Sequence, residues 1–465
     1  MKTIQFARGL IGAVPQSNIL SQVLALFCSV LVTFRTSAEE PKVALPPPPR
    51  QTNQSAAVSH PLATIDTNRT LRLMEVVSEV LAENPSIKAA RANWESMRER
   101  IPQARAWEDP RLGVDVERYG TSRFADYSDA EWMVSQMIPL SGKNRRRARV
   151  AQTEAQIAFQ EVRKRELDLT TRARLAYFDY VNAAEQIAIN AKNISLVRQF
   201  AEISRSKYET GNKPQTDLLA AETEAARMEE AQVDLSRMVG DAQSQLNVLM
   251  NHPVVSPLGR PLMATSAPPQ LDLSALMILA LSNRPELESN RRKVLAANER
   301  ITLAKRNWIP DPELRLEARQ LKSAGGRFEE YDTGIFITVP WLNRSKYKAA
   351  IREAETSRES AHYELAAIES ELFGTVRVQV RKIETLHHHL EIYRSRILPL
   401  ARQTVDSARI SYESDKSSFL DLITAQRGLQ EAESMYWHHA TEYEKALAEL
   451  DALIGNSPFP NPITK

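Results

Sequence analysis

The chain has 465 residues, of which only 14 are Gly and one is Cys. Because Gly destabilises helix interiors and makes up about 7 % of an average protein, its scarcity favours long helices. A single Cys excludes a disulfide scaffold and a cysteine-rich metal module. The 60 basic and 58 acidic residues exclude the strongly basic balance typical of nucleic-acid-binding proteins, so no nucleic-acid partner is expected.

Residues 1–38 predict an export signal. Lys2 and Arg8 precede an apolar run over 19–34, and small residues follow as far as Ala38. This is the order of regions in a secretory signal peptide, so we expect cleavage after Ala38. A retained membrane anchor is the alternative, but the apolar run is shorter than the roughly 20 residues that a spanning helix needs.

Two Pro-rich stretches divide the remainder. Residues 39–67 contain four consecutive prolines and are expected to form a disordered leader. The second stretch, residues 253–270, is expected to be a linker between two segments of similar length. These segments and the short tail after them are 68–252, 271–455 and 456–465.

The two segments resemble each other. Four landmarks recur in the same order at offsets between 200 and 204 residues, which indicates an internal duplication. The matched pairs are Asn84-Pro85 with Arg284-Pro285, Asp109-Pro110 with Asp311-Pro312, Pro139 with Pro340, and Asp217-Leu218 with Asp421-Leu422.

Each segment predicts the same order of elements: two shorter helices, a β-hairpin, a very long helix, a tip and a closing helix. The long helices are predicted over 143–208 and 344–412, with tips at 209–216 and 413–418. At about 1.5 Å per residue, the first of them is roughly 100 Å long. We therefore expect a mainly α fold with a small β part, built from duplicated long helical hairpins and two β-hairpins.

The predicted strands alternate between apolar and polar residues: Leu314, Leu316 and Ala318 share one face, and charged residues occupy the other. Their length and alternation are typical of strands that cross an outer membrane. Four strands cannot close, so such strands require several copies of the chain, and three copies give about twelve strands. Two solvent-exposed hairpins that cap a helical bundle are the alternative. The strands are predicted over 111–119, 132–139, 313–320 and 331–339.

Basic residues follow each β-hairpin: Lys143, Arg145, Arg146, Arg147, Arg344 and Lys346. If the strands cross a bilayer, these side chains lie at its headgroups, and we expect them to contact lipid phosphates. Cations at the start of a helix oppose the helix dipole, so an anion is needed to compensate, and phosphate is a candidate. The alternative is an ordinary solvated helix start.

The tip segments 208–219 and 412–423, together with the duplicated plan, resemble those of the TolC-like outer-membrane efflux protein family over about residues 70–455. The resemblance implies a homotrimer in which a twelve-stranded β-barrel in the outer membrane of a Gram-negative-type bacterium continues into a periplasmic α-helical barrel. It implies a passive exit channel for efflux or type I secretion, with a periplasmic adaptor and an inner-membrane pump as partners, and neither an enzyme nor a cofactor. The heavy-metal efflux branch is one option. A periplasmic coiled-coil scaffold without a pore is the alternative function.

The resemblance also assigns roles to the two tips. Adaptor docking is expected at Tyr208, Gly211, Leu218, Leu219, Asp415 and Leu422. Gly211 matches the family's tip glycine, whereas the second tip has Asp415 at that place.

The resemblance further implies a closed gate where the tips meet. Its members are Thr216, Asp217, Tyr412, Lys416 and Asp421, and we hypothesise a hydrogen bond between Asp217 and Tyr412. Ser417 stands where the family has a gate arginine, and Lys416 is a candidate substitute. The resemblance implies that Asp421 faces the pore, where three copies of it would form an anionic ring that favours cations. Capping of the following helix is the alternative for Asp217 and Asp421.

Five of the eight His residues lie in the second helical hairpin. Three consecutive His residues on a helix point in directions about 100° apart and cannot bind one ion together. No metal site is therefore assigned, although a metal-contacting band is conceivable at His387, His388, His438 and His439. The sequence has no phosphate-binding loop, zinc-protease motif or nucleophile elbow, which agrees with a protein that is not an enzyme.

Overall fold

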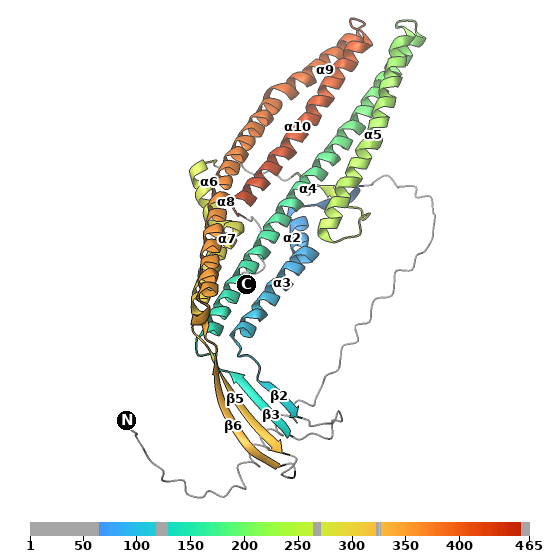
Figure 1. The fold of residues 1–465 in the computed structure, drawn as a ribbon. Helices are drawn as coiled ribbons and strands as arrows, with labels where there is room; N and C mark the ends of the chain where they lie inside the picture. The colour runs from blue at the N-terminus through green and yellow to red at the C-terminus, as the bar shows by residue number, and fades with distance from the viewer. Residues whose placement is uncertain (1–64, 118–128, 264–270, 322–324, 326, 457–465) are drawn as a thin grey trace. The chain divides into compact units, whose positions relative to one another are not determined.

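The computed structural model describes residues 65–117, 129–263, 271–321, 325 and 327–456. The predicted signal segment, most of the predicted leader and nearly all of the predicted C-terminal tail lie outside the described residues. The described part is mainly helical, with a four-stranded sheet at one end of the helices (Figure 1).

The two repeats have matching helices, in the predicted order. Those of the first repeat are α2 (Leu73–Glu83), α3 (Pro85–Arg105), α4 (Lys143–Glu209) and α5 (Gln215–Met250). Those of the second are α6 (Leu273–Asn283), α7 (Pro285–Arg306), α8 (Arg344–Ile392), α9 (Leu398–Glu413) and α10 (Phe419–Leu453). Pro begins α3 and α7, where the first turn needs no N–H donor. The Asn84 side chain caps α3 by accepting a hydrogen bond from the Ser86 N–H at 2.9 Å.

The second long helix is interrupted, which the sequence analysis did not predict. A π-helical turn, Tyr393–Ile397, separates α8 from α9. Pro399 explains the interruption, because it has no N–H to donate to the Ser395 carbonyl and its ring crowds that carbonyl. By contrast, α4 contains neither Pro nor Gly and runs unbroken for 67 residues.

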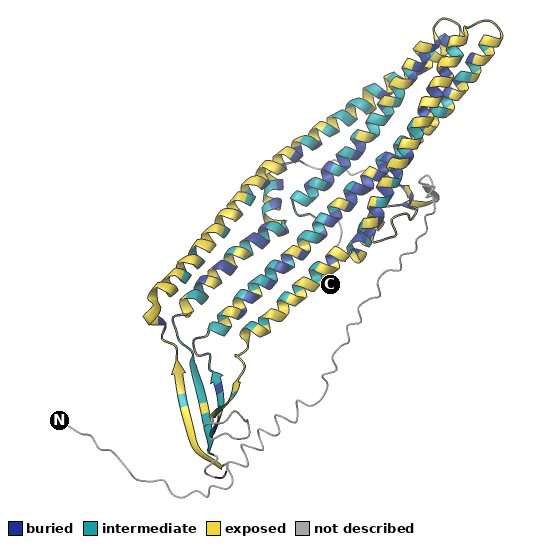
Figure 2. Ribbon diagram, turned by 45° about the vertical axis from the view of Figure 1, so that its right-hand side comes forward, coloured by how far each residue is buried: buried dark blue, intermediate teal, exposed yellow. Residues whose placement is uncertain are grey.

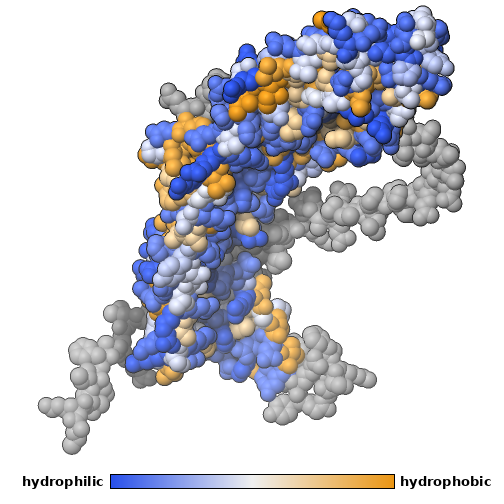
Figure 3. Space-filling model, turned by 90° about the horizontal axis from the view of Figure 1, so that it is seen from above, coloured by the Kyte–Doolittle hydropathy of each residue, from blue (hydrophilic) through white to orange (hydrophobic). Residues whose placement is uncertain are grey.

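Helix α4 is central to the packing of the helical part. It contacts α3 and α5 of its own repeat and α7 and α10 of the second repeat. Buried residues therefore occur along most of its length, whereas those of α8 are confined to the segment from Leu372 to Ile383 (Figure 2). Seen from above, the molecular surface is mostly hydrophilic with separate hydrophobic patches (Figure 3).

A two-stranded parallel sheet joins the end of the predicted leader to the predicted linker. Its strands are β1 (Asp66–Leu71) and β4 (Gly259–Pro261). The prediction that Asp66 and Thr67 belong to a disordered leader is therefore wrong. The buried hydroxyl of Tyr177 in α4 holds this sheet by donating to the Leu262 carbonyl at 2.7 Å. Only Gly fits at position 259, because a Cβ there would lie 2.4 Å from the Arg69 carbonyl oxygen.

The four-stranded sheet contains β2 (Arg111–Glu117), β3 (Asp129–Met137), β5 (Pro312–Leu321) and β6 (Arg327–Ile337), all antiparallel in the order β2-β3-β5-β6. Strands β3 and β6 begin earlier than predicted, because their first residues still find partners: Asp129 pairs with both Glu117 and Leu321. In the described ranges, every helix falls short of the length and hydrophobicity that a membrane-crossing helix requires.

Candidate functional site

One face of the four-stranded sheet is apolar across all four strands. Residues that are directly opposite each other in neighbouring strands point to the same face. The register aligns Leu112, Val134 and Leu316 across three strands, and it aligns Val114 with Trp132 one step further along. The same face of β6 carries Tyr331, Ile335 and Ile337. Several of these side chains are strongly exposed, with 72 % of Leu112 and 69 % of Ile335 accessible.

The opposite face of the sheet is polar and crossed by ion pairs. Arg319 of β5 lies 3.4 Å from Glu131 of β3 and 3.5 Å from Glu330 of β6. The guanidinium of Arg315 stacks over the ring of Phe336 at 4.0 Å. The sheet thus separates an apolar surface from a charged one, which is the arrangement of a sheet with lipid on one side and water on the other.

Both edges of this sheet are open. Within the described residues, β2 pairs only with β3, and β6 pairs only with β5. An unpaired edge exposes a row of backbone N–H and C=O groups, and such an edge is not viable inside a bilayer. The sheet therefore needs further strands if its apolar face contacts lipid.

The start of α4 has a protein anion as its neighbour. Asp311, which precedes β5 in the second repeat, accepts hydrogen bonds from the Ser141 N–H at 2.8 Å and the Ser141 hydroxyl at 2.9 Å. It also lies 3.0 Å from the Lys143 ammonium, and both side chains are largely buried. The anion that compensates the basic helix start is thus Asp311, and the suggestion of a lipid phosphate is wrong for Lys143.

The other basic residues of this region differ in their partners. Arg146 lies 3.4 Å from Glu299 of α7, and Arg147 donates to the Asn144 side chain at 3.3 Å. Arg145, Arg344 and Lys346 are exposed. Lys143, Arg147, Lys346 and Asp311 line a cleft of about 360 Å³ where the sheet meets the helices.

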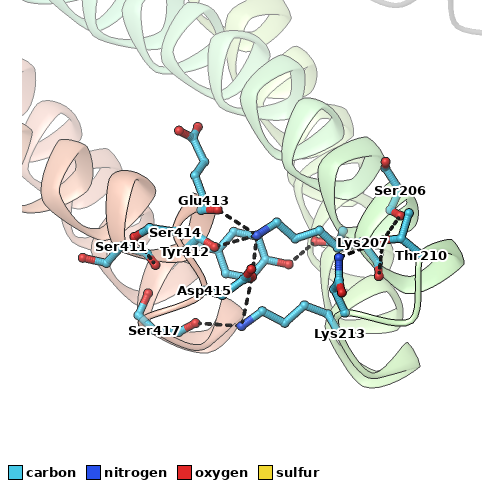
Figure 4. Close-up of polar contacts among 12 residues, drawn as sticks. Ser206, Lys207, Thr210, Lys213, Ser411, Tyr412, Glu413, Ser414, Asp415 and Ser417 are labelled. Carbon is cyan, nitrogen blue, oxygen red and sulfur yellow. Dashed lines mark hydrogen bonds and ion pairs between the residues drawn. The ribbon is translucent and has the colours of Figure 1, made fainter.

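Two lysines reach the second tip, Lys207 from the end of α4 and Lys213 from the first tip, and sequence reasoning missed both (Figure 4). The Lys207 ammonium donates to the carbonyls of Tyr412 and Glu413, each at 3.0 Å, and lies 2.6 Å from the Asp415 carboxylate. Lys213 donates to the Ser417 carbonyl at 3.3 Å and lies 3.8 Å from Asp415. These carbonyls belong to the end of α9 and the turn after it, where a helix favours cations.

The hypothesised hydrogen bond between Asp217 and Tyr412 is not formed in the described chain. The buried hydroxyl of Tyr412 pairs instead with the Ser204 hydroxyl at 2.9 Å. Burial raises the pKa of Tyr412, and the nearby negative charge of Asp217 adds to this rise. Asp217 is therefore close enough to act on Tyr412 through its field, but Ser204 is the hydrogen-bonding partner.

The second tip depends on two aspartates. Asp415 has a left-handed backbone with φ of 59°, the same region that Gly211 adopts in the first tip with φ of 73°. Hydrogen bonding and charge from Lys207 lower the pKa of Asp415. Asp421 forms a capping box with Ser418, whose hydroxyl lies 2.8 Å from the Asp421 carboxylate. The helix-capping role is therefore confirmed for Asp421.

The remaining tip residues divide by exposure. Tyr208 and Leu219 are exposed, with 42 % and 50 % accessible, and Leu218 is half-buried. Leu422 is only 1 % exposed because it packs in a core with Tyr412 and Phe419. Its expected role in docking is wrong for this reason. Thr216 and Lys416 are exposed. Lys207 and Lys213, and not Lys416, make the cationic contacts near Ser417.

The histidines form a ring cluster beside the π-helical turn. The rings of His389 and His439 are 4.9 Å apart, and that of Tyr393 lies 5.2 Å from His439. Burial and the two neighbouring histidines lower the pKa of His439. In the part of the chain that the structure describes, no group of three or more His, Cys, Asp or Glu side chains is arranged to hold a metal ion.

Comparison with known proteins agrees with this architecture. The sequence model of the outer membrane efflux protein family matches residues 76–252 and 276–456. The alkaline protease secretion protein AprF of Pseudomonas aeruginosa is 25 % identical over 76 % of this chain and 75 % of its own length. The cobalt-zinc-cadmium resistance protein CzcC of Cupriavidus metallidurans is 21 % identical over 83 % of this chain and 90 % of its own.

Among solved structures, the CmeC outer membrane channel of Campylobacter jejuni superposes with a TM-score of 0.70 at 15 % identity, covering 82 % of this chain and 85 % of CmeC. The family match and the relatives, together with this fold, identify an export channel of the outer membrane that extends into the periplasm. The chain belongs to the outer membrane efflux protein family.

Proposed function

We propose that three copies of the chain assemble into one channel, with their sheets joined in a twelve-stranded β-barrel and their helices in a continuous α-helical barrel. The observation that carries this proposal is the four-stranded sheet, which has one apolar face, one charged face and two open edges. Joining the edges of neighbouring copies satisfies their backbone groups, and closure leaves no edge in the bilayer.

Three copies fit the size that a channel needs. A barrel of about eight strands is filled by its own side chains, whereas larger barrels enclose a lumen. Twelve strands place the apolar face of each sheet against lipid and its ion-paired face towards the lumen. The charged face, with Arg319 between Glu131 and Glu330, then lines a water-filled path.

The periplasmic end is proposed to dock an adaptor, which links the channel to an inner-membrane pump. The tips carry exposed side chains for such a contact, Tyr208 and Leu219. The channel itself conducts passively, and the pump selects the cargo. The names of two relatives refer to protease secretion and to cobalt, zinc and cadmium resistance, so polypeptides and metal ions are both candidate cargo classes.

The tips are also proposed to hold the channel closed. Lys207 and Lys213 tie the end of the second helical hairpin to the first. Opening separates these tips and breaks the contacts of both lysines. Asp421 of each copy contributes to an anionic ring near the closed end, with Thr216, Asp217 and Lys416 beside it, and this ring favours cations.

The experiment combines location, size and conductance. Full-length protein expressed in a Gram-negative host is expected in outer-membrane fractions, as a trimer that resists SDS until heated, and to conduct ions in planar bilayers. A monomer that purifies without detergent and carries no current would contradict the proposal and favour a periplasmic scaffold.

A further inference from the structure

The contact between Asp311 and the start of α4 joins the two repeats. Asp311 lies just before β5, and Ser141 and Lys143 lie just after β3, so the contact is made where two neighbouring strands enter and leave the sheet. The carboxylate binds the N-terminal end of α4, which the helix dipole makes favourable for an anion. Within the described residues, β3 and β5 are the only neighbouring strands of this sheet that come from different repeats.

The duplication supplies a second acid and a second cation at matching positions, with Leu342 in the place of Ser141. Asp109 precedes β2 as Asp311 precedes β5, and Arg344 begins α8 as Lys143 begins α4. Strands β2 and β6 form opposite edges of the sheet, so Asp109 and Arg344 belong to opposite edges. Both residues are exposed, and within the described residues neither side chain has a polar partner.

The strand register extends in the same way. Inside the chain, Val134 of β3 lies opposite Leu316 of β5. In the duplication, the offset that matches Pro139 with Pro340 also matches Val134 with Ile335. The offset that matches Asp109 with Asp311 also matches Val114 with Leu316. Ile335 of one copy then lies opposite Val114 of the next. Both side chains are on the apolar face of the sheet and are strongly exposed in the single chain.

We propose that the junction between two copies of this chain repeats the junction between its two halves. Asp109 of one copy pairs with Arg344 of its neighbour and binds the start of the neighbour's α8, while Ile335 lies directly opposite Val114. This proposal rests on the trimer of the proposed function and specifies how its copies meet.

Alternative registers are less favourable for physical reasons. A shift by one residue places Ile335 opposite Gly113 or Asp115, which belong to the polar face, and turns every side chain of one edge to the wrong side. A shift by two residues keeps the faces but moves Asp109 by roughly 7 Å along the strand direction, away from Arg344.

Pairs of engineered cysteines test the register. The natural chain has one Cys, Cys28, which lies in the predicted signal segment. Directly opposite residues in antiparallel strands have Cβ atoms about 5 Å apart, which is close enough for a disulfide after small adjustments. The variant Ile335→Cys with Val114→Cys is expected to give covalent trimers after mild oxidation of the full-length protein in membranes.

Two matched controls keep one cysteine and move the other by two residues on the same face. Ile335→Cys with Leu112→Cys, and Ile335→Cys with Val116→Cys, are each expected to cross-link at least fivefold less. If either control pair cross-links as well as the 335/114 pair or better, the proposed register is wrong.

Charge reversal tests the ion pair. Asp109→Lys and Arg344→Glu are each expected to lower the temperature at which the SDS-resistant trimer dissociates, and the double variant is expected to recover most of the loss. Asp109→Lys combined with Lys346→Glu is the control and should recover less. Failure of the Arg344→Glu double variant to recover more than this control would overturn the pairing.

The oligomeric state of the wild-type protein distinguishes failure of the trimer from failure of the proposed junction. If its trimer forms but the cysteine or charge results differ from those above, the junction is wrong and the trimeric channel stands. If the wild-type chain stays monomeric in detergent and in membranes, the trimer and the junction both fail.

Discussion

The two helical tips solve the same backbone problem with different residues. Both helices end in a left-handed residue, Gly211 in the first tip and Asp415 in the second. Gly adopts this conformation without strain because it has no Cβ, whereas Asp is tolerated there at some cost. Asp415 gives the second tip two ion pairs that Gly could not form, because its carboxylate lies close to the ammonium groups of Lys207 and Lys213. One tip is thus built for an unstrained turn and the other for a contact between tips.

The largest effect is expected from Lys207→Met, which removes the cation from the contact and keeps an unbranched side chain. It abolishes two hydrogen bonds to carbonyls and the ion pair with Asp415. Hydrogen bonds from a charged donor contribute roughly 1.5–3 kcal/mol each, so we expect the resting conductance in planar bilayers to rise at least tenfold. Lys416→Met is the matched control at the same tip. An equal conductance for the two variants would contradict the role of Lys207.

A smaller rise is expected from Asp415→Asn, because Lys207 keeps its carbonyl partners while Asn still tolerates the left-handed backbone. Asp415→Gly removes the backbone strain as well as the charge, so it separates the two contributions. If the charge matters, both variants leak to a similar extent. A leak with Asn and none with Gly would assign the effect to the backbone.

The same carboxylate gives the closed tips a dependence on pH. Lys207 lowers the pKa of Asp415 in the closed state. The contact is therefore fully present above the ordinary Asp pKa of about 3.9 and is lost as the pH falls through the lower, closed-state pKa. Acidification of the planar-bilayer chamber should raise the resting conductance of the wild type, and it should raise that of Lys207→Met less.

Gly211→Ala tests the left-handed turn of the first tip. A Cβ at this position meets no atom within 4 Å, so the change acts through its left-handed φ of 73° alone. The expected cost is about 1–2 kcal/mol of local stability, seen as faster amide hydrogen exchange in the ends of α4 and α5, with little change in conductance. Gly211→Asn, which tolerates this conformation better, should recover part of the loss.

The smallest effect is expected from Tyr412→Phe. It removes the buried hydrogen bond to Ser204 but keeps the ring that packs against Phe419 at 5.6 Å. The loss is about 0.5–1.5 kcal/mol, measurable as a lower thermal midpoint of the trimer. Ser204→Ala should produce a similar loss, and the double variant should add little to it. Full additivity of the two changes would contradict the pairing.

The elements that could be predicted from the sequence are those with a strong local signal. Proline at the starts of α3 and α7, and the alternation of Leu314, Leu316 and Ala318 in β5, fix the type and position of their elements within a few residues. The two-stranded sheet could not be predicted, because β1 and β4 are short, have no repeated pattern and pair across about 190 residues. The π-helical turn was missed although its cause, Pro399, is visible in the sequence.

The contacts of the functional site were harder to predict from the sequence than the helices and strands, because they form only in the tertiary structure. Lys207 precedes the tip segment in the sequence, but the carbonyls that it reaches belong to the other helical hairpin, about 200 residues away. Asp311 has a recognisable Asp-Pro motif, yet its role at α4 follows only once β3 and β5 are neighbours. For Asp421, where the partner is three residues away, the capping alternative was available from the sequence alone and the structure confirms it.

The interruption of the second long helix has a mechanical consequence. Helix α4 runs without interruption for 67 residues, so it connects the first tip to the sheet as one rigid element. In the second repeat, the π-helical turn at Tyr393–Ile397 is a joint, since the backbone there has left the regular α-helical pattern. We therefore expect bending of the second helical hairpin to be concentrated at this turn, where α10 is the only one of its two helices that runs past without interruption. In the proposed channel, such bending would widen the end that carries the tips and leave the four-stranded sheet in place.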